Sequence, residues 1–501
     1  MMNSRLSVRR LLKTATRGTV RAALYVVGLV AAVFVTIVIV FAVQARVRLP
    51  DLHPWHRIEV GGEFRAGGAA PKTFAEYRAL EDRLFEEVRA RVIDDPAVAS
   101  SDAVSRYNPN SIPAQLALGE RYNHSYELVP SQVHGAVLLV HGLTDSPYSM
   151  RSLADLFFAR GFYVLVLRLP GHGTVPAGLL QVRWEDWYGA VELAARHAAQ
   201  RAGGKPFYAG GYSTGAPLLA LLAVRGLEDA TLPRPQRLFF VSAAIGVSRF
   251  AALANIASTL SFLPYFEKAK WLDVLPEYDP YKYNSFPVNA ANQIYRLTRE
   301  LQHALSAAGQ RGRLGAMPRV LAFQSVIDAT VTAADVVHEF FLLLPGPGHE
   351  LVAFDVNRSH GWVGLIAPGP REAFERIRSA PALPFALAVV ANRSPGSREV
   401  AVYAREAGST EMRVEPLTLE WPRDVPSLGH VALPFPVDDP VYGLQPITGG
   451  PHAWPIGRLD VRGEPGAIRV PLGMFGRLRS NPFFAVVRSK IAAAIEADLA
   501  R

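Results

Sequence analysis

The feature that most restricts the fold of this chain is an alternation of apolar runs and helix-forming stretches between residues 125 and 245. Short apolar runs such as GAVLLVHG (135–142) and FYVLVLRLPGHG (162–173) alternate with longer stretches such as WEDWYGAVELAARHAAQRAG (184–203). Strands that are apolar throughout need cover on both faces, and the intervening helices supply it. The alternation therefore predicts an α/β fold with a mostly parallel sheet and helices on both faces, whose first part spans residues 72–246.

The alternation is interrupted between residues 247 and 317, a stretch rich in helix formers and aromatic residues. An excursion of this length inside an α/β sheet is predicted to be a helical lid rather than a structureless loop. Its large apolar side chains either pack helices together or line an apolar acyl pocket, and the sequence leaves both interpretations open. These residues are Phe250, Leu260, Phe262, Leu263, Tyr265, Phe266, Trp271, Tyr278, Tyr281, Tyr283 and Phe286.

The strand pattern resumes at RVLAFQSVID, and residues 318–501 are predicted to form the second part of the core. Two strand-like runs, PFALAVVANR (384–393) and EPLTLEW (415–421), lie in a region that is harder to interpret, and a closing helix is expected within residues 481–500. An insertion into the core is predicted around residues 357–420.

The basic character of the chain is concentrated at its N-terminus. The formal net charge is +9, but six basic residues in segment 1–21 precede the first acidic residue, Asp51, which leaves about +3 for the remainder. A nearly balanced surface is a poor polyanion binder, so we expect no nucleic-acid partner.

An uncharged apolar run, AALYVVGLVAAVFVTIVIVFAV, follows at residues 22–43. As a helix it would be roughly 33 Å long, enough to cross a bilayer. A cleaved signal peptide is the alternative, with Val43-Gln44-Ala45 as a small-residue cleavage site, although this run is longer than the usual signal-peptide core. We favour a single-pass anchor with segment 1–21 cytoplasmic and the rest extracytoplasmic, which is the periplasm in a bacterial chain.

The anchor is predicted to be joined to the core by a linker, residues 44–71, which is rich in proline and glycine. The core then begins with an amphipathic helix, TFAEYRALEDRLFEEVRARV (73–92), whose apolar residues recur at helical spacing. The chain contains no cysteine, which fits an oxidising compartment without proving one.

The segment GGYSTG contains a G-x-S-x-G pattern at residues 211–215, with Ser213 at its centre. A short strand precedes it and an apolar helix follows, which is the context in which a strained turn exposes a nucleophilic serine hydroxyl. Gly211 and Gly215 are expected because such a turn leaves no room for a Cβ atom beside the neighbouring strand and helix. A glycine-rich turn holding an ordinary serine is the alternative.

Acyl transfer also needs two backbone N–H donors for the oxyanion of the tetrahedral intermediate. Thr214, directly after the nucleophile, is the first candidate, and Leu143, in the loop after the strand LLVHG, is the second. His141 in that loop is interpreted as a structural hydrogen-bonding residue.

The stretch LLVHGLTDSPYSMRSLADLFFARGFYVLVLRLPGHGT (138–174), the W-x-x-W at 184–187 and GGYSTGA (210–216) together resemble the α/β-hydrolase superfamily. Within it they resemble the carboxylesterase and monoacylglycerol-lipase-like branch. The likeness covers about residues 130–245 and 318–356. It implies the α/β-hydrolase fold, a Ser-Asp-His triad in that chain order and no cofactor. His172 matches a loop motif of the family and is therefore expected to be structural.

The resemblance places the acid of the triad in the turn VIDATV, at Asp328, with Asp335 as the less well placed alternative. The base is disputed between two histidines. His360 lies at an ordinary family spacing from Asp328, whereas His430, in SLGHV, resembles the family's histidine loop but requires an insertion before it. Because the entropic cost of closing a loop grows only with the logarithm of its length, we favour His430. His338 and His349 are expected to be structural.

The predicted activity is hydrolysis of carboxylic esters, small or lipid-like, through an acyl-enzyme on Ser213. A non-catalytic, membrane-tethered binding domain of the same fold remains the alternative, as does a peptidase of the same superfamily. No metal-ligand spacing or phosphate-binding glycine loop is present in the sequence, so no metal or cofactor is expected.

Overall fold

A computed structural model describes most of the chain. The described residues are 24–36, 39–40, 43, 47, 49–67, 70–99, 102–119, 121–246, 264–328, 330–369, 372, 376, 379–446, 454–459, 461, 468 and 470–500. The predicted cytoplasmic segment 1–21 and the first part of the predicted lid, 247–263, lie outside them.

One ten-stranded sheet runs through the domain, in the order β1-β3-β2-β4-β5-β8-β9-β10-β11-β12. The strands from β3 to β10 in this order are parallel, and β1 at one edge and β11 and β12 at the other are antiparallel to their neighbours. The strands are β1 (Tyr126–Leu128), β2 (Gly135–Val140), β3 (Phe162–Leu167), β4 (Phe207–Tyr212), β5 (Arg237–Val241), β8 (Arg319–Ser325), β9 (Glu350–Phe354), β10 (Ala386–Asn392), β11 (Glu399–Arg405) and β12 (Arg413–Glu420). A separate small pair consists of β6 (Trp271–Asp273) and β7 (Phe286–Pro287).

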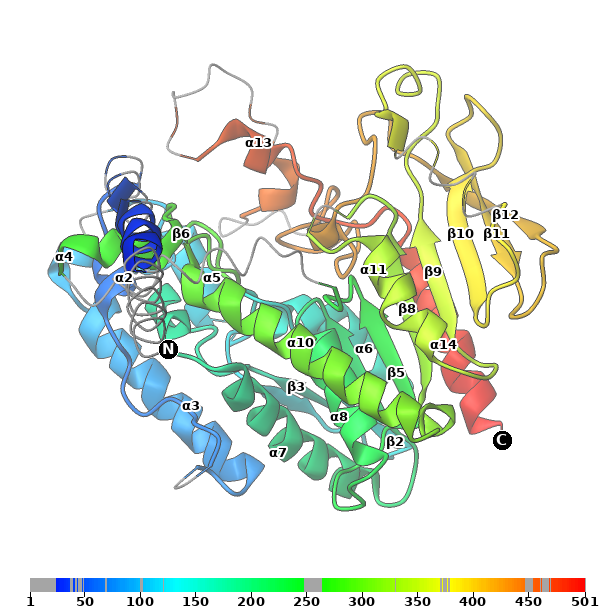
Figure 1. Ribbon diagram of the computed structural model, residues 1–501, viewed down its shortest axis with the longest axis horizontal. Helices are drawn as coiled ribbons and strands as arrows, with labels where there is room; N and C mark the ends of the chain where they lie inside the picture. The colour runs from blue at the N-terminus through cyan, green and yellow to red at the C-terminus, as the bar shows by residue number, and fades with distance from the viewer. Residues whose placement is uncertain are drawn as a thin grey trace, which may run out of the picture.

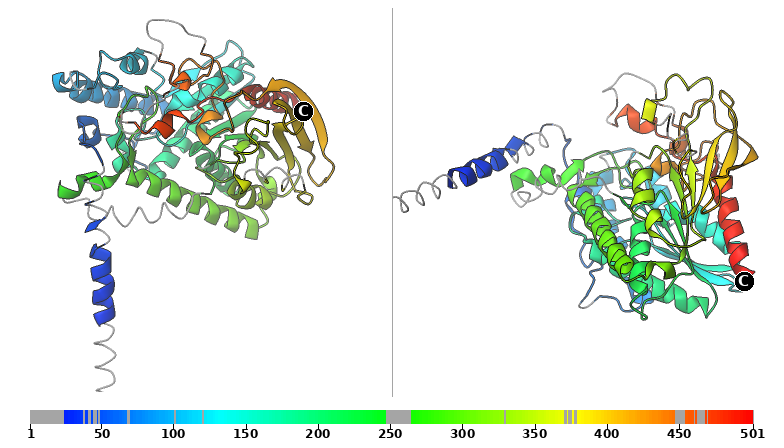
Figure 2. Two further views of the ribbon diagram at one scale, coloured as in Figure 1. Left: turned by 90° about the horizontal axis from the view of Figure 1, so that it is seen from above. Right: turned by 45° about the vertical axis from the view of Figure 1, so that its right-hand side comes forward.

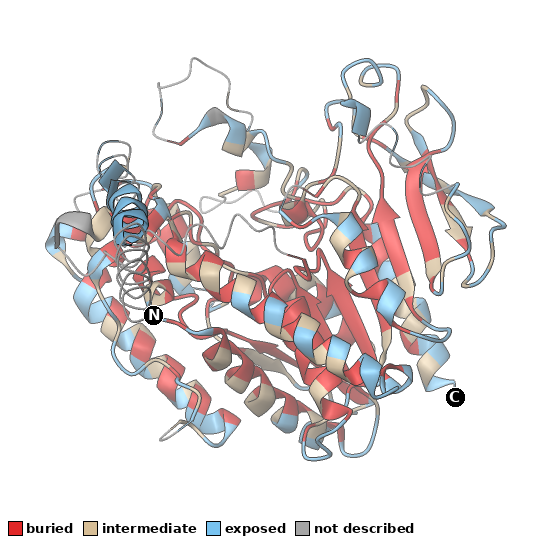
Figure 3. Ribbon diagram, in the orientation of Figure 1, coloured by how far each residue is buried: buried red, intermediate tan, exposed pale blue. Residues whose placement is uncertain are grey.

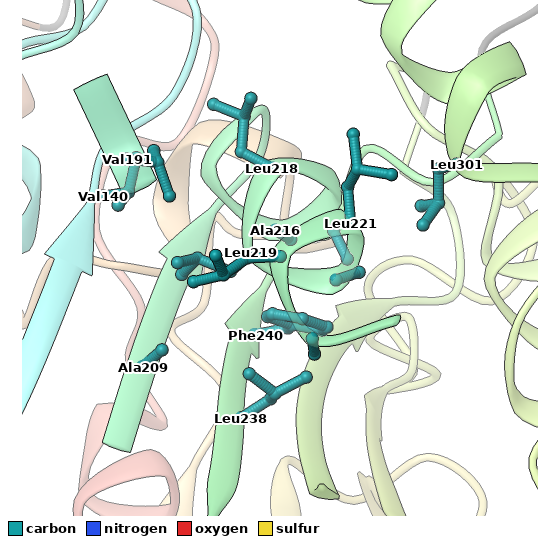
Figure 4. Packing of buried hydrophobic residues seen from close by; sticks show 14 of the residues in the cluster. Val140, Val191, Ala209, Ala216, Leu218, Leu219, Leu221, Leu238, Phe240 and Leu301 are labelled. Carbon is teal, nitrogen blue, oxygen red and sulfur yellow. The ribbon is translucent and has the colours of Figure 1, made fainter. Parts of the chain in front are cut away.

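Both faces of the central strands are buried, as their apolar runs predict. In β2, Leu138 and Val140 join the core cluster on one face, whereas Val137 and Leu139 join the cluster on the other. Side chains alternate between the two faces of a strand, so a strand covered on both sides must be apolar at every position. Figure 4 shows the first cluster, in which side chains of β2, β4 and β5 meet those of the covering helices.

Helices cover the two faces of the sheet in separate layers (Figure 1). Three long helices share the cluster that includes Leu138: α7 (Trp184–Ala202), α8 (Gly215–Gly226) and α10 (Val288–Gln310). Two helices pack on the opposite face: α6 (Arg151–Phe158) and α14 (Phe484–Leu499). The burial pattern in Figure 3 follows this arrangement, since the central strands are buried, the edge strand β12 is largely exposed and the helices are exposed on their outer sides.

The helix α10 changes the interpretation of the predicted lid. It was assigned to the lid because it follows the break in strand alternation, yet Leu297, Leu301 and Leu305 are buried in the core cluster, where α10 packs on α8. An amphipathic stripe has the same spacing in either setting, so sequence periodicity could not distinguish a lid helix from a core helix.

Strands β10, β11 and β12 lie in the region predicted as an insertion around residues 357–420. They extend the main sheet rather than form a separate unit, with β10 parallel to β9 and the last two strands antiparallel (Figure 2). The runs at 384–393 and 415–421 overlap β10 and β12, whereas β11 was not anticipated.

The predicted amphipathic helix near the start of the domain is α3 (Phe74–Val88), capped by Thr73, whose side chain accepts a hydrogen bond from the Glu76 N–H. Its apolar residues Phe74 and Tyr77 pack into the main core cluster. Further helices in the described part of the domain are α2 (Pro54–Arg57), α4 (Pro96–Ala99), α5 (Ile112–Gly119), α11 (Ala333–His338), α13 (Leu472–Phe475) and a π-helix at Arg89–Ile93. Short 3-10 turns span Pro147–Met150, Pro176–Leu180, Pro264–Lys270, Leu314–Ala316, Phe341–Leu343, His430–Ala432 and Ile456–Arg458.

The predicted membrane-spanning segment, residues 22–43, is described only in part. Residues 24–36 are helical and stand apart from the sheet domain in Figure 2. Among the residues that the structure describes, no helix combines the length and the apolar character needed to cross a membrane.

Candidate active site

Ser213 occupies the sharp turn between β4 and α8. Its φ is 51°, in the left-handed region that residues other than glycine seldom adopt. Its N–H donates to the Val241 carbonyl at 3.0 Å, and its own carbonyl accepts from the N–H groups of Ala216 (3.1 Å) and Ala244 (3.2 Å). Such a conformation costs about 1–3 kcal/mol and persists only where the surroundings enforce it. These bonds hold the Ser213 side chain at the carboxyl end of the parallel strands.

The two glycines of the motif are required by close backbone approach. A Cβ atom on Gly211 would lie 2.5 Å from the Ala216 nitrogen, and one on Gly215 would lie 2.1 Å from the Val140 carbonyl oxygen. Both distances are far inside van der Waals contact with backbone atoms that cannot move aside. The turn therefore admits only glycine at these positions, as the motif predicts.

His430 lies within hydrogen-bonding distance of both Ser213 and Asp328. Its Nε2 is 2.9 Å from Ser213 Oγ, and its Nδ1 is 2.7 Å from Asp328 Oδ2. An ionised carboxylate only accepts hydrogen bonds, so Nδ1 is protonated in this arrangement and Nε2 is free to accept the serine proton. The three side chains thus form one continuous hydrogen-bonded chain, and each is at least nine-tenths buried.

Two serines at strand ends fix the loop that bears His430. Ser242, directly after β5, donates from its Oγ to the His430 carbonyl at 3.1 Å. Ser325, the last residue of β8, donates from its Oγ to the Leu428 carbonyl at 2.7 Å. The histidine loop is therefore attached to the same sheet edge that presents Ser213.

Asp328, in the turn after β8, is held by hydrogen bonds at both carboxylate oxygens. Oδ1 accepts from the N–H groups of Thr330 (2.8 Å) and Val331 (2.9 Å). Oδ2 accepts from the Gln324 amide at 3.0 Å as well as from His430. The sequence analysis does not identify Gln324 as a site residue. The one indication in the sequence is that Gln324 is a polar residue directly after the apolar run VLAF.

The structure does not bring the two alternative residues to this site. His360 is exposed, and its ring lies beside Gly396 in the turn between β10 and β11, at the far end of the sheet. Asp335 lies in the first turn of α11, where its N–H bonds to the Thr332 cap. His338 is exposed at the end of the same helix, and His349 is buried at the start of β9.

The chain reaches His430 by a return path over the carboxyl end of the sheet. After β9, Asn357 donates from its N–H to the Pro426 carbonyl at 2.8 Å and from its side-chain amide to the Val425 carbonyl at 2.9 Å. These bonds tie the segment that leaves β9 to the segment that returns from β12. The extension by β10–β12 thus separates Asp328 and His430 by 102 positions in the sequence while the two remain in contact.

The two predicted oxyanion donors flank the nucleophile. Thr214 follows Ser213 directly, and Leu143 follows Gly142, at which a Cβ atom would lie 3.0 Å from the Ser213 Cβ. Among the hydrogen bonds of the described residues, neither the Thr214 nor the Leu143 N–H is used as a donor. Both are therefore available to an oxygen on a substrate.

The conformation of the loop that contains Leu143 is supported by His141. Its Nε2 accepts from the Leu169 N–H at 3.0 Å, and its Nδ1 lies 2.8 Å from the Gly142 carbonyl, to which it donates. Burial lowers the pKa of His141 well below its usual range, so the ring is neutral. Burial likewise lowers the pKa of the neighbouring His172 to about 3. These contacts support the structural roles expected for both histidines.

A cavity of about 230 Å³ adjoins the hydrogen-bonded side chains. Tyr212 and Val431, which neighbour Ser213 and His430 in the chain, both line it. Tyr283 and Phe286 from the predicted lid also line it, whereas Trp271, Tyr278 and Tyr281 are buried in packing clusters. Tyr283 also belongs to the main core cluster and Phe286 packs against it, so the two aromatic residues that line the cavity contribute to packing as well. Phe250, Leu260, Phe262 and Leu263 lie outside the described residues.

Groups that could hold a metal ion are absent from the described part of the chain, where no three His, Asp or Glu side chains cluster in a suitable way. The chemistry of the site as described is that of a serine, an imidazole, a carboxylate and backbone N–H donors.

Part of this chain is similar in sequence to known proteins. Residues 131–340, which are less than half of the chain, match the family described as serine aminopeptidase, S33. A thermostable monoacylglycerol lipase of Bacillus sp. (strain H-257) is 38% identical over 87 residues, which are 17% of this chain and 34% of that protein. The chain thus spans about a third of the length of the curated relative that it matches.

Solved structures of two lipases are also similar to this chain. A monoacylglycerol lipase from Paleococcus ferrophilus is 15% identical, with 46% of this chain and 88% of that chain covered and a TM-score of 0.34. A soluble variant of monoglyceride lipase from Saccharomyces cerevisiae is 15% identical, with 46% and 81% covered and a TM-score of 0.35. The family match, together with the mostly parallel sheet, supports an α/β-hydrolase fold.

Proposed function

We propose that this chain is a serine hydrolase that cleaves carboxylic esters through an acyl-enzyme on Ser213. The observation that supports the proposal most is the hydrogen-bonded chain from Ser213 Oγ through His430 to Asp328. The similarity of residues 131–340 to a serine aminopeptidase family, and of 87 residues to a monoacylglycerol lipase, supports hydrolysis of acyl compounds more broadly.

In the first half of the proposed reaction, Nε2 of His430 removes the proton from Ser213 as Oγ attacks the ester carbonyl carbon. The carbonyl oxygen becomes an oxyanion, which accepts hydrogen bonds from the N–H groups of Leu143 and Thr214. Asp328 keeps the proton of His430 on Nδ1 and stabilises the imidazolium. His430 then protonates the leaving alcohol, and the bond between that oxygen and the acyl carbon breaks.

In the second half, a water molecule takes the position of the alcohol. His430 removes a proton from this water, its oxygen attacks the acyl carbon, and the same two N–H groups stabilise the second oxyanion. The bond to Ser213 Oγ breaks as Oγ takes the proton back from His430. The products are a carboxylic acid, an alcohol and the unmodified enzyme.

The lining of the adjacent cavity favours esters with apolar acyl groups. Tyr283, Phe286, Val431 and Phe435 provide apolar surface in the cavity that adjoins Ser213, and its lining also includes the charged side chains of Asp145, Asp273, Lys282, Arg477 and Arg479. Burial of acyl methylene groups against the apolar part of this lining would favour binding. We therefore propose small or lipid-like esters as substrates.

The similarity of residues 131–340 to a serine aminopeptidase family supports a second candidate function, which is cleavage of an amide or peptide bond. The same serine, histidine and oxyanion donors perform both reactions, because both proceed through an acyl-enzyme. Relative kcat/KM values for matched p-nitrophenyl esters and amino-acid p-nitroanilides distinguish the two. A preference for the anilides would replace the ester proposal by the peptidase one.

The direct test of the ester proposal is hydrolysis of p-nitrophenyl esters by the full-length chain in detergent, compared with the Ser213→Ala variant. We expect activity that is lost in the variant, together with labelling of Ser213 by an active-site phosphonate. Folded protein that neither hydrolyses esters or anilides nor reacts with the phosphonate would contradict the proposal. It would favour a non-catalytic binding domain of the same fold.

We also propose that residues 22–43 anchor the chain in a membrane, with the hydrolase domain on the extracytoplasmic side. The run is uncharged, basic residues precede it, and the large apolar side chains described within it are exposed. Deletion of residues 1–45 should move the protein from the alkali-resistant membrane fraction to the soluble fraction. Release of the full-length chain by alkali, or an N-terminus beginning near residue 46, would contradict an uncleaved anchor.

A further inference from the structure

The loop that presents Leu143 is attached to a segment far away in the chain. Residues 141–146, which we call the oxyanion loop, contact residues 274–285, which we call the bracing segment. The Tyr283 N–H donates to the Thr144 carbonyl at 2.8 Å. Next to it, Lys282 Nζ lies 3.1 Å from Asp145 Oδ2. A backbone bond and an ion pair thus connect the two segments at adjacent positions.

The ion pair is asymmetric in its burial. The Asp145 side chain is 8% exposed, whereas that of Lys282 is 28% exposed and lines the cavity beside Ser213. Burial raises the pKa of Asp145, and the charge of Lys282 opposes this shift. Removing one partner of a buried pair leaves an uncompensated charge, which is far more costly than the pair itself. Among the groups around Asp145, Lys282 therefore does most to favour the charged form of its carboxyl.

Asp145 is close to the reacting atoms. A Cβ atom on Gly142 would lie 3.0 Å from Asp145 Oδ2 and 3.0 Å from Ser213 Cβ, so the carboxylate and the nucleophile flank the same glycine. Leu143, the proposed oxyanion donor, follows that glycine directly. A second negative charge here would oppose formation of the oxyanion unless a cation neutralised it.

The oxyanion loop also has a strained backbone at the point of attachment. Thr144 has a φ of 65°, a left-handed conformation that is unusual for a residue with a branched side chain. Its carbonyl is the acceptor for the Tyr283 N–H. The bracing segment therefore acts on the residue between Leu143 and Asp145, where a change of φ would redirect the Leu143 N–H.

The bracing segment is itself held in place before it reaches the oxyanion loop. Asp279 Oδ1 accepts from the N–H groups of Tyr281 (3.0 Å) and Lys282 (3.1 Å) and from the Tyr442 hydroxyl (2.5 Å). Glu277 accepts from the N–H groups of Asn284 (2.9 Å) and Ser285 (2.8 Å). Both carboxylates are fully buried, so Lys282 is presented from a fixed turn.

We propose that Lys282 is a positioning residue for ester hydrolysis, whose ion pair with Asp145 holds the oxyanion loop and neutralises the carboxylate beside the developing oxyanion. This inference rests on the proposed function. Lys282 acts through Asp145 and the loop and takes no part in the transfer of protons.

The test is steady-state ester hydrolysis by the Lys282→Met variant of the full-length chain. We expect kcat to fall about 10- to 100-fold, somewhat less than the loss of an oxyanion donor, with a smaller change in KM. The Asp145→Asn substitution should restore part of kcat when it is added to Lys282→Met, because it removes the uncompensated charge. Lys282→Arg, which keeps the cation, should retain most of the activity.

The pH profile provides a readout that a purely structural role would not change. Lys282, Asp279 and His430 act on Asp145, and the hydroxyls of Tyr212 and Tyr442 also experience its charge. The charged residues Asp273, Arg477 and Arg479 line the same cavity. Without Lys282 the pKa of Asp145 rises further, so the carboxyl is neutralised more readily as pH falls. The deficit of Lys282→Met relative to the parent chain should therefore shrink towards lower pH, and this trend should disappear in the double variant.

Lys490→Met is a control for the loss of a lysine of similar exposure, because Lys490 is 31% exposed and forms an ion pair between α14 and β9, away from Ser213, with Glu350, which is less buried than Asp145. It should leave kcat within about twofold of the parent chain. Parent-like kcat in Lys282→Met, or a deficit that neither changes with pH nor responds to Asp145→Asn, would overturn the inference. If Lys282→Met does not fold, Lys282→Gln replaces it under the same criteria. An inactive parent chain would instead contradict the proposed function itself.

Discussion

The two halves of the sheet supply their parts of the candidate site in different ways. In the half from β1 to β5, Ser213 and Thr214 follow β4 directly, and Leu143 lies three residues beyond the end of β2. In the half from β8 to β12, Asp328 follows its strand closely, but His430 arrives only after four further strands, 102 positions later. The first half is specified by local turns, whereas the second depends on contacts between distant segments.

The comparison shows why a long detour is compatible with a compact site. The entropic cost of closing a loop grows with the logarithm of its length, so additional strands between Asp328 and His430 add little to that cost. The detour is also stabilised, because β10–β12 continue the sheet and Asn357 binds the returning chain. The elbow at Ser213 has no comparable tolerance, since a Cβ atom on Gly211 or Gly215 would lie within 2.5 Å of backbone atoms.

The largest expected effect tests which histidine the second half supplies. His430→Ala should lower kcat for ester hydrolysis by about 10⁴-fold or more, to the level of Ser213→Ala, because the serine loses its base. His360→Ala should remain within about twofold of the parent chain, because its exposed ring lies beside Gly396. A loss confined to His360→Ala would contradict the proposed site.

The next largest effect is expected when a glycine of the first half of the sheet, Gly215, is replaced by alanine and the result is compared with the same replacement of Gly429 in the second half. Gly215→Ala places a Cβ 2.1 Å from the Val140 carbonyl oxygen, so we expect a loss of more than about 1–3 kcal/mol in unfolding free energy together with a large loss of kcat. Gly429→Ala, next to His430, meets no atom within 4 Å and has an extended backbone. It should change both quantities little. Denaturant unfolding and ester hydrolysis measure the contrast, and equal effects at the two sites would contradict it.

A smaller effect should follow from the contact that the sequence did not reveal. Gln324→Leu removes the amide that donates to Asp328 Oδ2 but leaves the two backbone N–H donors on Oδ1. We expect kcat to fall about 10-fold, because Asp328 can rotate away from His430, whereas KM should change less. Gln324→Glu adds a like charge beside Asp328 and should be worse. Unchanged kcat in both variants would show that Oδ1 alone fixes the carboxylate.

The smallest expected effect concerns the bracing segment that joins the two halves. Burial raises the pKa of Glu277 to about 7, above its ordinary value near 4.5. A carboxyl whose pKa is raised by folding contributes stability at low pH that is lost as pH rises through the folded-state pKa. The free energy of unfolding of Glu277→Gln, compared with that of the parent chain, should therefore rise by about 1 kcal/mol or more from pH 5 to pH 8. A difference independent of pH would contradict this ionisation.

The sequence predicted more of the first half than of the second. Except for Arg237 at the start of β5, the strands from β2 to β5 carry no charged residue because both faces are covered, and such runs are easily identified. By contrast, β11 was missed, and α10 was assigned to a lid because its apolar stripe suits a lid and a core equally well. Gln324 has no motif of its own, and its contact with Asp328 appears only once the turn after β8 is folded.

By itself, the sequence determined the α/β alternation, the elbow at Ser213 and the oxyanion loop, because these depend on residues that are neighbours in the chain and on steric limits at single positions. It also favoured His430 over His360 through a short motif. The tertiary structure decided which histidine meets Ser213, how Gln324 supports Asp328 and how Lys282 meets Asp145. These pairings join residues 4 to 217 positions apart, and only the packing of the sheet and its loops brings their atoms within hydrogen-bonding distance.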